Sequence, residues 1–190
     1  LINYDFSPAF HWKIGSVGLN ASPEDLRLTR EHYNTEELRN QSGTWRGRDG
    51  AGGGTELWGA GNGPNGKGGF TYALGVGNGQ GDADNFDVNA AKDFYGRATY
   101  KLGGLGEIGG TAGQAKEESA FYVDNSARLG GFFYAGDAVT DTLQDKFNVV
   151  GGDLDLWYAR LNVVALAMTM SSDVGGTDRS SLAYFVEGNY

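Results

Sequence analysis

The chain has 190 residues, no cysteine and a formal net charge of -9 at neutral pH. The lack of cysteine excludes a disulfide-stabilised scaffold, and the negative charge argues against nucleic acid as a partner, because binding a phosphate backbone needs a cationic face. Hydrophobic residues make up 39% of the chain, the mean hydropathy is -0.41, and no 18-residue apolar run occurs, so the sequence predicts no transmembrane helix.

Segments with alternating apolar and small or polar residues recur along the chain. In the segment 70–78, every second residue from Phe70 to Val76 is apolar, whereas the residues between them are threonine, alanine or glycine. Neighbouring side chains of a strand point to opposite faces, so this segment is predicted to be a strand with one apolar face. Strands are predicted at residues 9–19, 54–61, 69–78, 92–102, 105–114, 126–136, 147–158, 161–171 and 180–190.

The predicted connections differ in length. Short turns are expected at 61–69, 103–104 and 159–160, and longer loops at 79–91, 115–125, 137–146 and 172–179. Short turns on one rim and long loops on the other are typical of outer-membrane barrels.

The second face of the predicted strands suits a wet lumen as well as open solvent. In the segment 92–102, for example, this face carries Tyr95, Arg97, Thr99 and Lys101. We therefore expect an all-β fold, an antiparallel transmembrane β-barrel that is apolar outside and polar inside. The candidate pore-lining residues are Tyr95, Arg97, Lys101 and Arg128. A soluble, secreted β-sandwich, which would bury its apolar faces between two sheets, is the alternative.

The segment 20–53 interrupts the strand pattern. Ser22 and Pro23 form a typical helix start, so we expect one long loop that contains a short helix. On a barrel, such a loop would fold inward, and its mixed charges would set the transverse field at the constriction; an ordinary surface loop is the alternative. The constriction candidates are Arg27, Arg30, Glu31, Glu36, Glu37, Arg39, Arg46, Arg48 and Asp49.

Acidic residues concentrate in the predicted loops. These residues are Asp82, Asp84 and Asp87, then Glu117 and Glu118, then Asp137, Asp141 and Asp145, and finally Asp173 and Asp178. The first three place oxygen ligands close together, as Ca²⁺ prefers, which predicts a structural calcium site; a solvated acidic loop is the alternative.

The sequence offers little for catalysis. Its only histidines are His11 and His32, and neither accompanies a G-x-S-x-G motif. Two distant histidines without cysteine leave only carboxylates for a metal. We therefore expect a protein that is not an enzyme and needs no cofactor beyond the possible calcium.

The order of several motifs carries a resemblance to a known family. Along the chain stand Lys13–Leu19, a long loop, Arg48–Gly50, Tyr72–Gly79, Lys92–Tyr100 and the closing Ser181–Tyr190. This order resembles that of porins of the phosphate-selective porin O/P family. The resemblance implies a homotrimeric channel in the lipid of a Gram-negative outer membrane, passing small hydrophilic solutes or ions, with the loop after Leu19 at the constriction.

The chain also departs from that family. Its 190 residues accommodate roughly nine or ten strands, fewer than the about 16 of such porins. We therefore expect residues 1–190 to be a single but incomplete β-barrel domain. Cations on the predicted strands are few, which favours general diffusion over phosphate selectivity. A barrel that serves as a scaffold or sheath for a partner subunit, such as an electron-transfer protein, is a further hypothesis.

Overall fold

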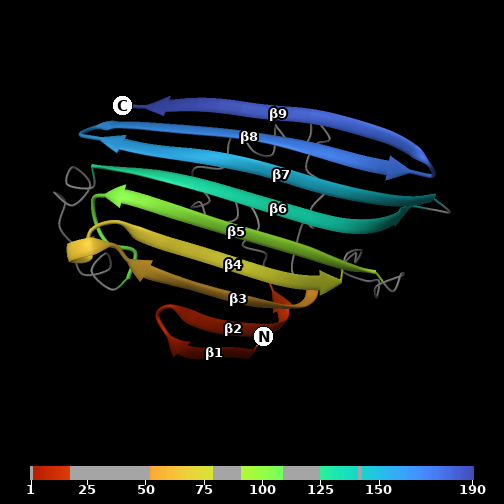
Figure 1. Cartoon of the computed structure of the whole chain (residues 1–190), viewed down its shortest axis with the longest axis horizontal. Helices are drawn as coiled ribbons and strands as arrows, with labels where there is room; N and C mark the ends of the chain where they lie inside the picture. Colours follow the sequence, from red (N-terminus) through yellow and green to blue (C-terminus); the bar gives the residue numbers. More distant parts are fainter. Residues whose placement is uncertain (1, 18–51, 79–90, 109–124, 141–142) are drawn as a thin grey trace.

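The chain forms one antiparallel β-sheet in the computed structural model, which describes residues 2–17, 52–78, 91–108, 125–140 and 143–190 (Figure 1). Each strand pairs with the next one in the sequence. The strands in these ranges are β1 (Ile2–Ser7), β2 (Phe10–Val17), β3 (Gly52–Asn62), β4 (Gly69–Asn78), β5 (Lys92–Gly103), β6 (Ser126–Thr140), β7 (Leu143–Tyr158), β8 (Leu161–Val174) and β9 (Thr177–Asn189). The predicted all-β, antiparallel fold is confirmed.

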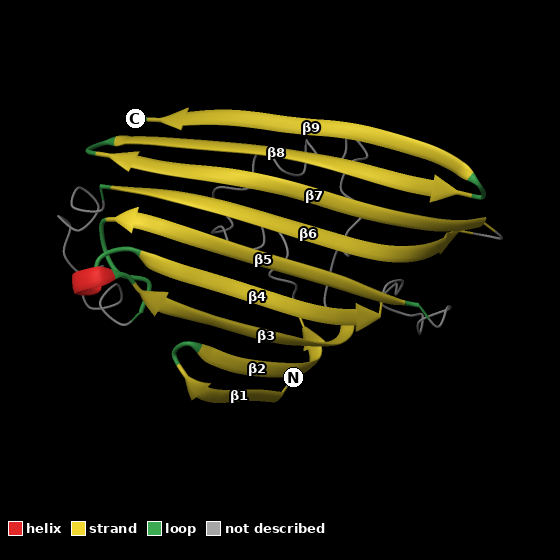
Figure 2. Ribbon diagram, viewed as in Figure 1, coloured by secondary structure: helices red, strands yellow, loops and turns green. Residues whose placement is uncertain are grey.

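The sheet is open. Within the described ranges, β1 and β9 form its two edges and do not pair with each other (Figure 2). Helical structure in the same ranges is limited to η3 (Pro64–Gly66), a short 3₁₀ turn between β3 and β4. No helix there is long and apolar enough to cross a membrane.

One strand prediction is wrong at its start, and one strand was not predicted. Residues 104–108, at the start of the predicted strand 105–114, form bends after β5, and residues 109–114 lie outside the described ranges. Conversely, β1 was not predicted, although Ile2, Tyr4 and Phe6 alternate with polar residues in it. The remaining predicted strands correspond to β2–β9.

Two segments predicted as long loops are largely strand instead. Residues 137–146 belong largely to β6 and β7, and residues 172–179 to β8 and β9. Gly175 and Gly176 have φ angles of 58° and 85°, the conformation that a two-residue hairpin turn requires. β4 and β8 end at the same rim of the sheet, so the long connection at 79–91 and the turn at Gly175 and Gly176 both start there. The long connection after β5 starts from the opposite rim. The predicted division into a short-turn rim and a long-loop rim is therefore wrong.

The two faces of the sheet carry opposite chemistry. One register row, which we call the outer row, crosses all nine strands through Tyr4, Trp12, Leu57, Leu74, Gly96, Phe133, Val150, Thr169 and Leu182. Its large apolar members other than Trp12 are 38% to 63% exposed. Next to it, on the other face, runs the inner row: Asp5, His11, Trp58, Ala73, Arg97, Phe132, Gly151, Met168 and Ala183. The outer row is thus largely apolar and exposed.

The inner face is divided along the sheet. On β3–β5 it buries charged side chains, such as Glu56, Arg97 and Lys101, which are 1% to 6% exposed. Toward β9 it becomes apolar, and its core cluster consists of Tyr95, Phe132, Tyr134, Phe147, Val149, Leu166, Met168, Met170 and Ala183. One face of a single sheet therefore provides both a polar and an apolar wall.

Substitution of Ala159 by glycine tests the turn between β7 and β8. Ala159 has a φ of 53°, which is unfavourable for a residue with a Cβ, and its N–H donates to Asn125 Oδ1 at 2.7 Å. We expect Ala159→Gly to raise the free energy of unfolding by about 0.5–1 kcal/mol, because relief of the backbone strain exceeds the entropy that glycine adds to the unfolded chain. Urea unfolding in detergent micelles, followed by tryptophan fluorescence, measures the change. Ala165→Gly, within β8, is the control and should destabilise; a loss of stability at both positions contradicts the prediction.

Candidate functional site

The structure brings the four predicted pore-lining residues onto one face. Tyr95, Arg97 and Lys101 occupy alternate positions of β5, and Arg128 is the register partner of Lys101 on β6. All four therefore lie on the inner face. Their predicted role in lining a pore stays a prediction.

Arg97 forms a buried ion pair across an intervening strand. Its two terminal nitrogens donate to the carboxylate of Asp153 on β7 at 2.7 and 2.9 Å, and both side chains are at most 6% exposed. The guanidinium carbon also lies 6.0 Å from the ring centre of Phe132. Between the pair runs β6, where Gly130 faces Asp153: a Cβ on Gly130 would lie 2.3 Å from the carboxylate. A two-point Arg–carboxylate contact of this kind fixes both groups in one geometry.

Glu56 forms a second pair with its register partner on the adjacent strand. Its side chain is fully buried, Lys13 Nζ on β2 lies 2.7 Å from its Oε1, and the hydroxyl of Tyr95 donates to its Oε2. Tyr95 stands on β5, so its ring crosses β4 at Gly75 to reach Glu56 on β3. A Cβ on Gly75 would lie 2.1 Å from Tyr95 Cζ. Glycine on the middle strand again lets its neighbours meet.

A third pair lies near the rim. Arg128 Nη2 is 2.8 Å from Oε1 of Glu107, which follows β5. Lys13, Arg97 and Arg128 thus each have a carboxylate partner. These three ion pairs contribute fixed dipoles to this part of the inner face.

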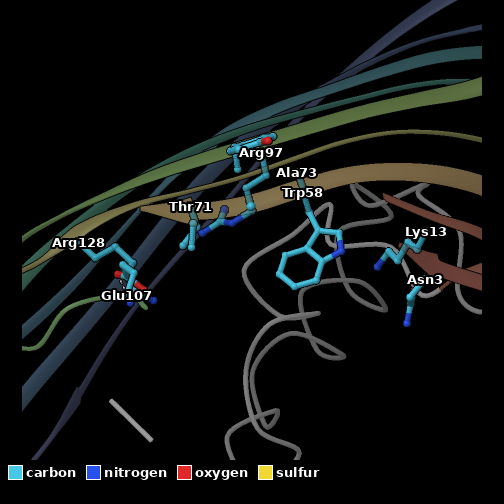
Figure 3. Close-up of a pocket in the computed structure, with 11 residues that line it drawn as sticks. Asn3, Lys13, Trp58, Thr71, Ala73, Arg97, Glu107 and Arg128 are labelled. Atoms are coloured by element: carbon cyan, nitrogen blue, oxygen red, sulfur yellow. Dashed lines mark hydrogen bonds and ion pairs between the residues drawn. The ribbon is translucent and has the colours of Figure 1, made fainter. Parts of the chain in front are cut away.

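Lys13, Arg97, Arg128 and Glu107 line a cavity of about 620 Å³. Its lining among the described residues is Asn3, Lys13, Trp58, Gly59, Ala60, Thr71, Tyr72, Ala73, Arg97, Glu107 and Arg128. Figure 3 shows Arg97, Thr71 and Trp58 on the same side of the sheet, with Arg128 beside Glu107. The indole of Trp58 stacks on His11, with ring centres 3.9 Å apart and planes 10° apart. The cavity wall thus combines an aromatic ring with hydrogen-bonding groups.

The partners of the cations were not predicted from the sequence. Acidic residues were assigned to loops, but Asp137, Asp145, Asp173 and Asp178 lie within β6, β7, β8 and β9, so that assignment is wrong for these four. Asp145 accepts a hydrogen bond from the buried Ser172. A signal for strand carboxylates existed: Asp153 and Asp155 alternate with apolar residues in a predicted strand. Such alternation gives the face of a carboxylate, although not its partner.

Several predicted sites lie outside the described residues. These are the constriction candidates Arg27 to Asp49, the calcium candidates Asp82, Asp84 and Asp87, and His32. Of the predicted segment 20–53, Gly52 and Gly53 open β3. Where the structure is described, no group of three or more histidine or acidic residues is placed to hold a metal ion. His11 contacts Asp5 at 2.6 Å and the carbonyl oxygen of Pro8.

Comparisons with models of known protein families, with curated proteins and with solved structures found no match to this chain. The function must therefore be inferred from the residues and their arrangement.

Two glycines of β4 test the close approach over the middle strand. Gly75→Ala should lower the free energy of unfolding by about 1–3 kcal/mol, because the new methyl overlaps the buried Tyr95 ring and separates its hydroxyl from Glu56. Gly77→Ala is the matched control on the same strand and face, since its Cβ would meet only a backbone oxygen, at 3.4 Å. Urea titrations of both variants measure the difference. Equal losses would show that Tyr95 does not depend on Gly75.

Proposed function

We propose that the chain forms part of a bacterial outer-membrane β-barrel that acts as a passive porin for small hydrophilic solutes or ions. The observation that carries the proposal is the inversion of the two faces. Apolar side chains of the outer row are exposed from β1 to β9, whereas Glu56, Arg97 and Asp153 are buried on the other side. In water, a contiguous apolar surface of this extent is unfavourable, whereas a bilayer solvates it.

The strand lengths are consistent with a membrane span. A tilted transmembrane strand needs about 9–11 residues, and β3–β9 have 10 to 16. Every backbone polar group inside a bilayer must also be satisfied within the protein. In the proposed barrel, the open edges β1 and β9 therefore each pair with a further strand. The resemblance to the porin O/P family adds the expectation of a homotrimer.

Transport through such a barrel involves no bond-making. Rate and selectivity follow from the pore radius and from the fixed charges on its wall. Because Lys13, Arg97 and Arg128 are paired with carboxylates, the wall has no ladder of unpaired cations here. We therefore propose general diffusion rather than phosphate selectivity.

One observation favours a second function. The inner face toward β9 is apolar, with Val149, Leu166, Met168 and Met170 buried there. These packed apolar side chains offer water and ions no polar groups on that part of the inner wall. A barrel with this wall would act as a scaffold or sheath for a partner subunit that fills its lumen.

Arginine substitutions on the outer face test the membrane location. Val150 lies at the middle of β7 and Leu102 near the end of β5, and both are more than half exposed. In a bilayer, Val150→Arg should cost about 2–4 kcal/mol and Leu102→Arg about 0–1 kcal/mol, because the penalty depends on depth. Urea unfolding from lipid vesicles measures both. Losses within about 0.5 kcal/mol of each other, as expected on a water-exposed surface, would contradict the bilayer.

Conductance tests the porin itself. The detergent-extracted native protein, inserted in a planar bilayer, should give stepwise conductance in a salt gradient. Arg128→Glu, on the cavity wall, should shift the reversal potential toward cation preference. Lys67→Glu, an equal charge change in the turn between β3 and β4, should shift it less. Silence from verified, inserted protein would contradict the open pore and favour the filled barrel.

A further inference from the structure

We propose that the cavity beside Trp58 is a binding subsite for a neutral, hydroxylated ring, that is, a small sugar. The inference rests on the proposed function and names the class of solute that would bind in the pore. Three features of the cavity support this inference: two arginine N–H groups without an acceptor, cations that already have carboxylate partners, and the indole ring of Trp58.

The free donors belong to the two arginines. Nε of Arg97 and Nε of Arg128 are buried, and neither has a hydrogen-bond partner in the part of the chain that the structure describes. Both side chains line the cavity, and that of Arg97 is only 5% exposed. A buried N–H without an acceptor is unfavourable. A ligand oxygen in the cavity would remove this cost.

The charge balance selects against an anion. Both terminal nitrogens of Arg97 contact Asp153, and Nη2 of Arg128 contacts Glu107, so an anion would have to compete with a carboxylate that each guanidinium already has. Glu107 also lines the cavity and would repel an anion. A hydroxyl group both donates and accepts. It can therefore bind an arginine Nε–H and a carboxylate oxygen on the same wall.

The indole ring of Trp58 supplies the apolar contact. Trp58 lines the cavity and is held by its stack on His11, with Ala60 and Ala73 nearby on the wall. A sugar ring has an apolar C–H face that packs on an indole while its hydroxyls point outward. The cavity volume of about 620 Å³ lies within the range of small-molecule sites.

Maltose is the probe, with inorganic phosphate as the charged competitor. Ligand-observed NMR titration of the native protein in detergent micelles measures binding without any need for conduction. We expect saturable maltose binding that phosphate does not displace. Trp58→Leu should weaken it about tenfold, and Arg128→Lys, which keeps the charge but removes Nε–H, about threefold to tenfold. Trp12→Phe, on the outer face of β2, is the control and should leave the affinity unchanged.

Three outcomes would contradict the proposed sugar site. Saturable phosphate binding without maltose binding overturns the ligand class. Absence of maltose binding by folded protein overturns the site, and equal affinity in Trp58→Leu and native protein places the sugar elsewhere. The two proposals fail separately: a conducting channel that binds no maltose contradicts only the subsite, and a silent barrel that binds maltose contradicts only the open pore.

Discussion

The inner face depends on one steric constraint: side chains two strands apart meet only where the strand between them has no side chain. Adjacent strands lie about 4.8 Å apart, so next-nearest strands are separated by roughly twice that distance. Tyr95 reaches Glu56 across Gly75, and Asp153 reaches Arg97 across Gly130. Gly151 likewise has the Phe132 ring and Met168 on either side. Glycine therefore determines which inner side chains interact.

The same constraint shapes the electrostatics of the wall. The contact over Gly130 holds Arg97 against Asp153, and Lys13 faces Glu56 on the adjacent strand, so both cations have a carboxylate partner from another strand. Lys13 and Glu56, or Arg97 and Asp153, contribute a dipole rather than a net charge. In the proposed pore, such a wall would orient polar solutes without strongly selecting for sign. Within the described ranges, Nε of Arg97 and Nε of Arg128 have no hydrogen-bond partner, and both side chains line the cavity.

The outer face has the opposite requirement. It needs no specific contacts, only continuous apolarity, and the outer row supplies this from Tyr4 to Leu182 with small breaks at Gly96 and Thr169. Since this surface is exposed while charges are buried, the sheet is arranged inversely to a soluble domain. The inner wall is itself uneven, polar on β3–β5 and apolar toward β9. A single open pore and a filled barrel place different demands on that apolar part.

The sequence by itself determined the strands and the face of each residue, because the alternation of side chains along a strand is local. It placed β2–β9 and put Tyr95, Arg97 and Lys101 on one face. It missed β1 and misread the acidic ends of β6–β9 as loops, because composition alone does not separate carboxylates near the end of a strand from carboxylates in a turn. Only the tertiary structure decided which residues pair. Arg97 and Asp153 are 56 positions apart, and their contact depends on the register of β5, β6 and β7 and on Gly130 between them, which no local pattern encodes.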